Sequence, residues 1–236
     1  MQSSSSVWSA LTDIFVSPGA ALRGVDEHKG WSWLPLLLLI GLTAGAMMLY
    51  FNLVDFDIMK AQYLDVVAAE VSPNEREAME KFLTKTSMMA TSVINPLVMY
   101  LLIFAFTALW LMLATKMDPE NTHGYGDWFG FSCWIYFPNV LAALLLFAYV
   151  LVADPMPGML DLNLLSLNNL LLDLEFGSTW YTLAESFSPM TFWSIFLAAV
   201  GIQAWTRIDA ARAWVIAALP SVVIYGVWAL ILLLSN

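Results

Sequence analysis

The stretch TSMMATSVINPLVMYLLIFAFTALWLMLAT, residues 86–115, contains no charged side chain in 30 positions. An α-helix needs about 20 apolar residues to cross the roughly 30 Å of hydrocarbon in a bilayer. Four more runs share this character: residues 31–54, 128–153, 186–206 and 213–236. The chain is 60% hydrophobic and 12% charged, whereas soluble domains carry about 25% charge. We therefore predict an all-α integral membrane protein with five transmembrane helices.

The polar segments between these runs are too short for a separate soluble domain of ordinary size. Residues 1–236 are therefore predicted to form a single five-span membrane domain. Residues 1–30 lack the features of a cleaved signal peptide and are predicted to be a cytoplasmic interfacial segment. The predicted spans cover about residues 31–54, 88–115, 129–153, 188–206 and 213–234.

The placement of Lys and Arg in short loops predicts the orientation of the spans. Five of the nine basic residues fall in the N-terminal segment, the loop 116–127 and the turn 207–212, which five spans place on one side. The other side, with residues 55–85, 154–185 and the C-terminus, carries the remaining four on a longer stretch of chain. This bias predicts a cytoplasmic N-terminus and a C-terminus on the outside.

Three shorter elements are predicted outside the spans. A helix capped by Ser6, with Trp, Leu and Phe on one face, is expected to lie on the membrane surface, and Ser17–Pro18 can open a second turn. The sequence Ser72–Pro73–Asn74–Glu75 matches a capping box. The helix that begins there is predicted to continue into the second span, and residues 58–70 to form the other arm of a hairpin.

Leucines recur in a 4-3-4-3 pattern between residues 160 and 174, with Asn, Ser and Asp at most other positions. This spacing predicts an outer amphipathic helix of about fourteen residues between the third and fourth spans. Such a helix can lie in the outer interface, cap the bundle or contact a partner.

Intramembrane catalysis and proton coupling require ionisable groups inside the bilayer, and none of the five runs contains Asp, Glu, Lys, Arg or His. We therefore expect no enzyme activity, no catalytic or metal site and no cofactor. His123 and Asp127 could support only an interfacial reaction, and Asp127 is more simply a helix-start carboxylate. The outer side is acidic, so nucleic acid is not an expected partner.

Two asparagines stand beside prolines inside the runs, at Asn95–Pro96 and Pro138–Asn139. A proline leaves the carbonyl four residues earlier without its helical donor, and in lipid that carbonyl must find another. Kinked helices joined by these amides are one interpretation. A neutral polar crevice between spans 2, 3 and 5 is the other, and its candidate residues are Asn95, Pro96, Tyr136, Pro138, Asn139, Pro220 and Tyr225.

The order of the segments resembles the Ypt-interacting protein (Yip domain) family in its bacterial branch. The resemblance rests on Phe15–Val16–Ser17–Pro18, Trp33–Leu34–Pro35–Leu36, Gly124–Tyr125 with Tyr136–Phe137–Pro138, and Phe192–Trp193 to Gly201 before a short basic turn. It implies five transmembrane helices with a cytoplasmic N-terminus, here in the cytoplasmic (inner) membrane of a bacterium. Eukaryotic members bind Rab-type GTPases and one another in vesicle traffic. This chain has Val16–Ser17–Pro18 where those members have Asp-Leu-Tyr-Gly-Pro.

These observations lead to two hypotheses of function. The first is a non-enzymatic membrane protein of the Yip-domain type. It would associate with itself or with other membrane proteins, and would act in membrane organisation or trafficking-like roles. The second is a transporter, channel or lipid-handling protein that uses the polar crevice, since broken helices often line substrate sites. In either case the lipid bilayer is an expected partner.

Overall fold

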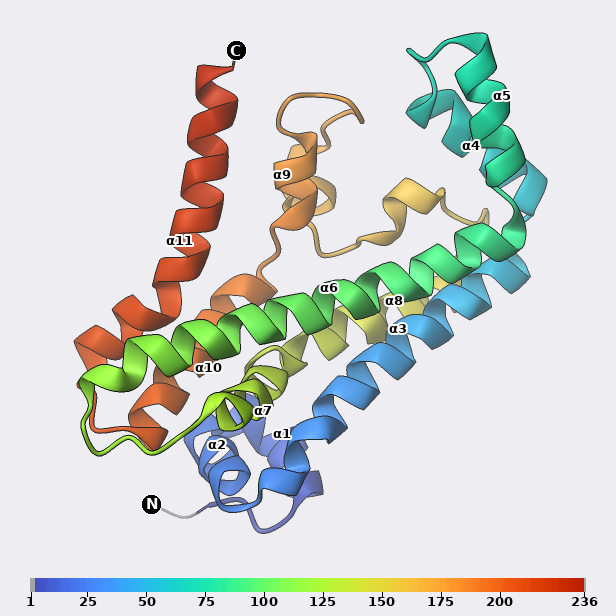
Figure 1. Cartoon of the computed structure of the whole chain (residues 1–236). Coiled ribbons are helices and arrows are strands. Elements are labelled where there is room, and N and C mark those ends of the chain that lie inside the picture. Colours follow the sequence, from blue (N-terminus) through green and yellow to red (C-terminus); the bar gives the residue numbers. More distant parts are fainter. Residues whose placement is uncertain (1–2, 236) are drawn as a thin grey trace. The chain divides into compact units, whose positions relative to one another are not determined.

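The structure, a computed structural model, describes residues 3–235, and every regular element in this range is helical (Figure 1). The α-helices are α1 (Val7–Val16), α2 (Pro18–Glu27), α3 (Trp33–Leu53), α4 (Phe56–Val67), α5 (Pro73–Phe82), α6 (Lys85–Ala114), α7 (Tyr125–Ile135), α8 (Val140–Val152), α9 (Tyr181–Ser186), α10 (Met190–Trp205) and α11 (Ala210–Leu234). Short helical turns are η1 (Lys29–Ser32), η2 (Thr115–Met117), η3 (Phe137–Asn139), η4 (Met159–Leu162) and η5 (Asn168–Leu172).

Four helical stretches are long and apolar enough to cross a membrane: Lys29–Leu53, Lys85–Met117, Tyr125–Val152 and Ala210–Leu234. They coincide with the predicted first, second, third and fifth spans, and this all-helical architecture fits an integral membrane protein. The predicted fourth span forms α10, which has 16 residues. At 1.5 Å per residue α10 is about 24 Å long, which is shorter than the roughly 30 Å of hydrocarbon in a bilayer. The count of five spans therefore stays a prediction.

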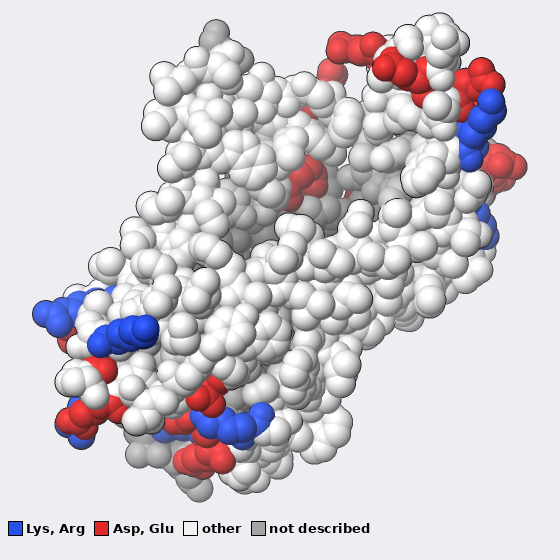
Figure 2. All heavy atoms as spheres, viewed as in Figure 1, with Lys and Arg blue, Asp and Glu red and all other residues white. Residues whose placement is uncertain are grey.

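The described chain divides into two compact units. Unit 1 contains residues 3–39, 99–139 and 189–235, and unit 2 contains residues 40–98 and 140–188. On the face shown in Figure 2, the surface of the long helices is almost entirely uncharged. Charged side chains gather over the α4–α5 hairpin in unit 2 and at the loop end of unit 1.

In unit 1, α2 packs against α1, α7 and α10, and α10 packs against α11. Gly201 allows α10 to approach α2 and α7 closely. A Cβ atom at this position would collide with the ring of Phe131 and with Leu22. The side chains of Leu22, Phe131 and Ile202 are fully buried here. The absence of one side chain thus lets α10 lie directly against α2 and α7.

Unit 2 has its own apolar core, formed by residues from α3, α4, α6, α8 and η4. Its members include Tyr50, Phe51, Met88 and Val150. The hydroxyl of Tyr50 donates a hydrogen bond to the Pro157 carbonyl over 2.9 Å, which ties the segment after α8 to α3. A buried tyrosine hydroxyl normally finds such a partner.

The N-terminal prediction is confirmed for its two helices. Ser6 and Ser9 form a capping box at the start of α1, and Ser17–Pro18 opens α2 with the proline at its first position. The face of α2 with Ala21, Leu22 and Val25 is buried in unit 1, so this segment is a packed part of the fold. Its position in the membrane interface stays a prediction.

The capping box at Ser72 and the helical hairpin are also confirmed. Arg76 of α5 contacts Asp65 of α4 over 2.6 Å. However, the prediction that α5 continues into the second span is wrong. The amide N–H groups of Thr84 and Ser87 each donate to the other residue's hydroxyl, at 3.0 and 3.2 Å, and this reciprocal cap starts α6 as a new helix.

The Leu-rich segment differs from the single amphipathic helix that its spacing predicts. It contains two separate short turns, η4 and η5, and Asp173 after η5 has a left-handed backbone. Polar side chains satisfy the backbone locally here. The Leu174 amide donates to Asn168 Oδ1 over 2.9 Å, and Asn163 Nδ2 donates to the Glu185 carbonyl over 2.8 Å. Side chains that bond the backbone in this way compete with helix formation.

Candidate functional site

Three polar segments that are distant in sequence meet at the loop end of unit 1. His123 Nε2 lies 2.8 Å from Asp26 Oδ1, which joins the loop after η2 to α2. The Arg207 amide donates to Asp118 Oδ2 over 2.8 Å, which joins the α10–α11 turn to the same loop. The three segments are those that the predicted topology places on one side of the membrane.

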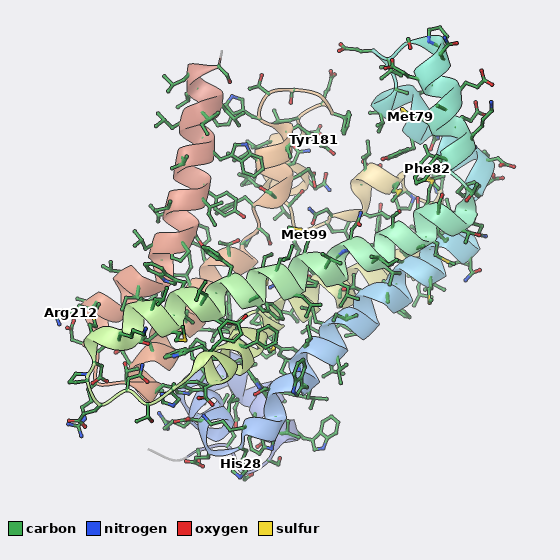
Figure 3. All side chains as sticks on the ribbon, viewed as in Figure 1. His28, Met79, Phe82, Met99, Tyr181 and Arg212 are labelled. Carbon is green, nitrogen blue, oxygen red and sulfur yellow. The ribbon has the colours of Figure 1, made fainter. Side chains whose placement is uncertain are left out.

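Lys29 links α2 to α7 at this end. Its Nζ atom lies 2.8 Å from Asp26 Oδ1 and 3.1 Å from Asp127 Oδ1. The ammonium group also lies 5.0 Å from the centre of the Trp205 ring, within the range of a cation–π contact. Nearby lies His28 at the end of α2, which Figure 3 labels. Its ring stacks on Trp31 with ring centres 4.5 Å apart.

His123 is held on both sides by oxygen acceptors. Its Nδ1 lies 2.8 Å from Asn121 Oδ1, opposite the Asp26 contact at Nε2. The orientation of the Asn121 amide is set by the bond from its Nδ2 to Thr115 Oγ1, over 2.8 Å. The ring also stacks on that of Trp205, with ring centres 4.7 Å apart.

Asp118 and Asp127 both accept backbone hydrogen bonds. Asp118 accepts from the amides of Arg207 and Glu120, and these bonds hold the pKa of its carboxyl below its ordinary value. Asp127 Oδ2 accepts from the Gly124 amide over 2.8 Å, which confirms its role as a helix-start carboxylate on α7. Both carboxylates thus fix chain segments in place.

A cavity of about 230 Å³ lies beside this polar cluster. Its lining residues come from α2, η1, α3, α7 and α10 and are Val25, Lys29, Ser32, Trp33, Gly126, Asp127, Phe129, Gly130 and Trp205. A Cβ atom at Gly130 would collide with the Ser32 hydroxyl, so η1 and α7 touch through this glycine. At Gly126, in contrast, an added Cβ atom would meet nothing within 4 Å.

Five of the seven predicted crevice residues belong to unit 1, and Asn95 and Pro96 belong to unit 2. The Tyr136 hydroxyl lies 3.2 Å from Thr107 Oγ1 of α6, and its ring stacks on Phe104 with centres 5.3 Å apart. Tyr136, at the end of α7, therefore contacts two residues of α6.

Asn139 and Asn95 have different environments. Asn139 Nδ2 donates to the Tyr136 carbonyl over 2.8 Å, within the turn η3 that Pro138 introduces between α7 and α8. Asn95 is exposed on α6. An amide donor beside a proline is thus present at Asn139, in a local turn rather than between two helices.

At Pro220 the donor is one that the sequence did not indicate. Pro220 lies inside the unbroken helix α11, and the carbonyl four residues earlier is that of Ile216. Trp110 Nε1 of α6 donates to this carbonyl over 2.9 Å. The proline thus frees an acceptor that joins α11 to α6, but the spacing of residues gave no signal that a tryptophan 106 positions away would be the donor.

The family model described as Yip1 domain matches residues 12–231, which is nearly the whole chain. The chain belongs to the Yip1 domain family. No significant match was found among the curated proteins, and none among the solved structures.

The sequence features that resemble the Yip family are packing points of unit 1. Gly124–Tyr125 starts α7, Pro138 lies in the turn that ends it, and Gly201 seats α10 against Phe131. In this Yip1 domain the features that carry the resemblance therefore position helices. The polar cluster at the loop end uses Asp26, Asn121 and Trp205, none of which the sequence analysis selected.

Proposed function

We propose that this Yip1-domain protein is a non-enzymatic membrane protein that acts by association. It would associate with itself or with other membrane proteins, in membrane organisation or trafficking-like roles. The match to the Yip1 domain over residues 12–231 carries this proposal, because the Yip resemblance implies association among members.

The arrangement of the polar groups supports a role without catalysis. His123 is engaged at both ring nitrogens, and Asp127 is engaged by Lys29 and by the Gly124 amide. A general base needs a free site within hydrogen-bond reach of its substrate. These groups instead hold the N-terminal segment, the 118–124 loop and the α10–α11 turn together.

We further propose that the protein belongs to the bacterial branch of the family and lies in the cytoplasmic membrane, with five spans and a cytoplasmic N-terminus. The Val16–Ser17–Pro18 segment, in place of the eukaryotic Asp-Leu-Tyr-Gly-Pro, supports the branch. The ion pairs and hydrogen bonds that join the three basic segments in unit 1 support their location on one side.

Association is tested with two differently tagged copies expressed together. Affinity capture of one tag in mild detergent is expected to bring down the second copy or another membrane protein, and mass measurement should give a particle larger than one chain. An unrelated tagged membrane protein at equal level is the control. A single-chain particle in detergent, together with no cross-link to any protein in intact membranes, would contradict the proposal.

A further inference from the structure

The cavity in unit 1 lies where two membrane-length helical stretches begin. Lys29–Leu53 and Tyr125–Val152 both start at its edge. Trp33 stands at the beginning of α3 and Tyr125 at the beginning of α7. Trp and Tyr side chains gather at the level of lipid headgroups. When these helices cross a bilayer, the cavity therefore lies at headgroup depth.

Aromatic rings form much of the cavity wall. Trp33 and Phe129 lie with ring centres 5.9 Å apart, and Trp205 is a further lining residue. The Trp33 side chain is 57% exposed, so the wall is open to the surroundings. The faces of such rings attract cations, and aromatic walls are used to recognise ammonium groups.

The charged lining residues have opposite signs. Lys29 and Asp127 both line the cavity and contact each other, with Asp26 beside Lys29. A purely anionic ligand would meet two carboxylates, and a purely cationic ligand would meet the ammonium group. Like-charge contacts of this kind oppose binding. A ligand that carries both a positive and a negative group fits the lining best.

Lys29 retains hydrogen-bonding capacity toward the cavity. An ammonium group has three N–H donors, and two of those of Lys29 face Asp26 and Asp127. The side chain is 51% exposed. The third donor is available for an oxygen of a phosphate group. A carboxylate can accept about four hydrogen bonds, so Asp127 can accept from an ammonium group in addition to Lys29 and the Gly124 amide. The exposed ring of Trp33 can receive the same group.

We propose that this cavity binds the zwitterionic headgroup of an aminophospholipid. The phosphodiester would lie near Lys29, and the ammonium group near Asp127 and the aromatic wall. The volume of about 230 Å³ is below that of pockets for drug-sized ligands, roughly 300–1,000 Å³, and suits a headgroup without its acyl chains. This binding does not depend on self-association of the protein.

Gly126 offers a direct test, because it lines the cavity and open space surrounds its Cβ position. Gly126→Phe adds an aromatic ring at the cavity wall, and its Cβ atom meets nothing within 4 Å. Gly226→Phe is the matched control, since Gly226 in α11 of the same unit is equally open and lies away from the lining residues. Circular dichroism and thermal melting establish that both variants fold.

The full-length protein is purified in detergent and titrated with phosphatidylethanolamine or phosphatidylglycerol, and bound lipid is counted by native mass spectrometry. Wild type is expected to bind phosphatidylethanolamine about tenfold more tightly than phosphatidylglycerol, and Gly126→Phe to lose about tenfold while Gly226→Phe keeps the wild-type affinity. Equal binding of both lipids, or unchanged binding by Gly126→Phe, would overturn the proposal.

A second pair of variants tests the aromatic wall at exposed positions. Trp33→Ala removes an exposed wall residue, and Trp8→Ala removes a similarly exposed tryptophan of α1. Binding of phosphatidylethanolamine should weaken about threefold in the first and stay unchanged in the second. Equal effects would count against the site. Soluble glycerophosphoethanolamine is added as a competitor. If it displaces phosphatidylethanolamine at equal concentration, the ligand of this site is the free headgroup rather than the lipid.

Discussion

Trp110 shows at the residue scale how a proline inside an apolar helix is accommodated. Pro220 cannot donate to the Ile216 carbonyl, and in hydrocarbon an unsatisfied carbonyl is costly. The Trp110 indole supplies the missing donor from α6, so the hydrogen bond that α11 loses becomes a link between two helices. We expect such a link to contribute about 1 kcal/mol.

Trp110→Phe is therefore predicted to lower the free energy of unfolding by about 1–2 kcal/mol, because it removes the donor but keeps an aromatic ring. The measurement is thermal or denaturant unfolding in detergent. In a Pro220→Ala background the helix itself can supply an N–H to Ile216, so the same substitution should cost less. An equal cost in both backgrounds would show that the hydrogen bond is not what stabilises the contact.

Asp118 is a residue whose charge stabilises a turn. Hydrogen bonds from the Arg207 and Glu120 amides lower the pKa of its carboxyl in the folded protein. A lowered folded pKa adds stability that is complete above the unfolded value of about 3.9 and is lost as pH falls through the folded value. The stabilisation should thus be present at neutral pH and disappear only in strong acid.

We accordingly expect Asp118→Asn to lower the melting temperature at pH 7, and the difference from wild type to shrink below about pH 4. Melting curves recorded from pH 3 to pH 7 in one detergent measure this. Glu70→Gln, at an exposed position of the loop after α4, is the control and should show no such pH-dependent difference. A constant difference at all pH values would contradict the role of the charge.

At the scale of elements, packing within unit 1 depends on Gly201. An Ala side chain there would collide with Phe131 and Leu22, both fully buried. Overpacking of this kind costs about 1–3 kcal/mol. Elsewhere in a helix, Gly→Ala generally stabilises, because alanine loses less conformational entropy on folding.

Gly201→Ala is predicted to lower the melting temperature, whereas Gly226→Ala in α11, where a Cβ meets nothing within 4 Å, should leave it unchanged or raise it. Both are measured on the purified protein in the same detergent. If the two variants behaved alike, the collision at Gly201 would not be significant and the α10 contacts would be looser than the structure indicates.

At the scale of the whole molecule, the number of spans decides where the C-terminus lies. α10 has only 16 residues, yet its C-terminal Trp205 is anchored to unit 1 through a 2.7 Å hydrogen bond to the Leu22 carbonyl. If α10 crosses the bilayer with the other four, the two ends of the chain lie on opposite sides. If it does not, they lie on the same side.

Cysteine labelling distinguishes these topologies. In a Cys133→Ala background, Ser5→Cys and Ser235→Cys place single thiols at exposed positions near the two ends. A membrane-impermeant maleimide should label Ser235→Cys in intact cells, and Ser5→Cys only after permeabilisation. Labelling of both, or of neither, in intact cells would show that the chain has an even number of spans.

Local patterns were enough to predict several elements. The Ser6 and Ser72 caps and the Pro18 helix start involve residues within three positions of one another. The break at Thr84 was missed although it is also local, because its Thr–Ser cap is a weaker signal than the long apolar run that follows. The Leu-rich segment differs from the predicted single helix. Leucine spacing carries no information about polar side chains that form hydrogen bonds with the backbone.

The sequence by itself determined that about half of the chain is apolar helix of membrane length, because the absence of charge over 20 or more residues leaves few other environments for it. Only the tertiary structure decided which groups satisfy one another. Asp26 and His123, Asp118 and Arg207, and Trp110 and Ile216 are each about 90 or more positions apart. Such contacts depend on how helices pack, and no periodicity along the chain encodes them.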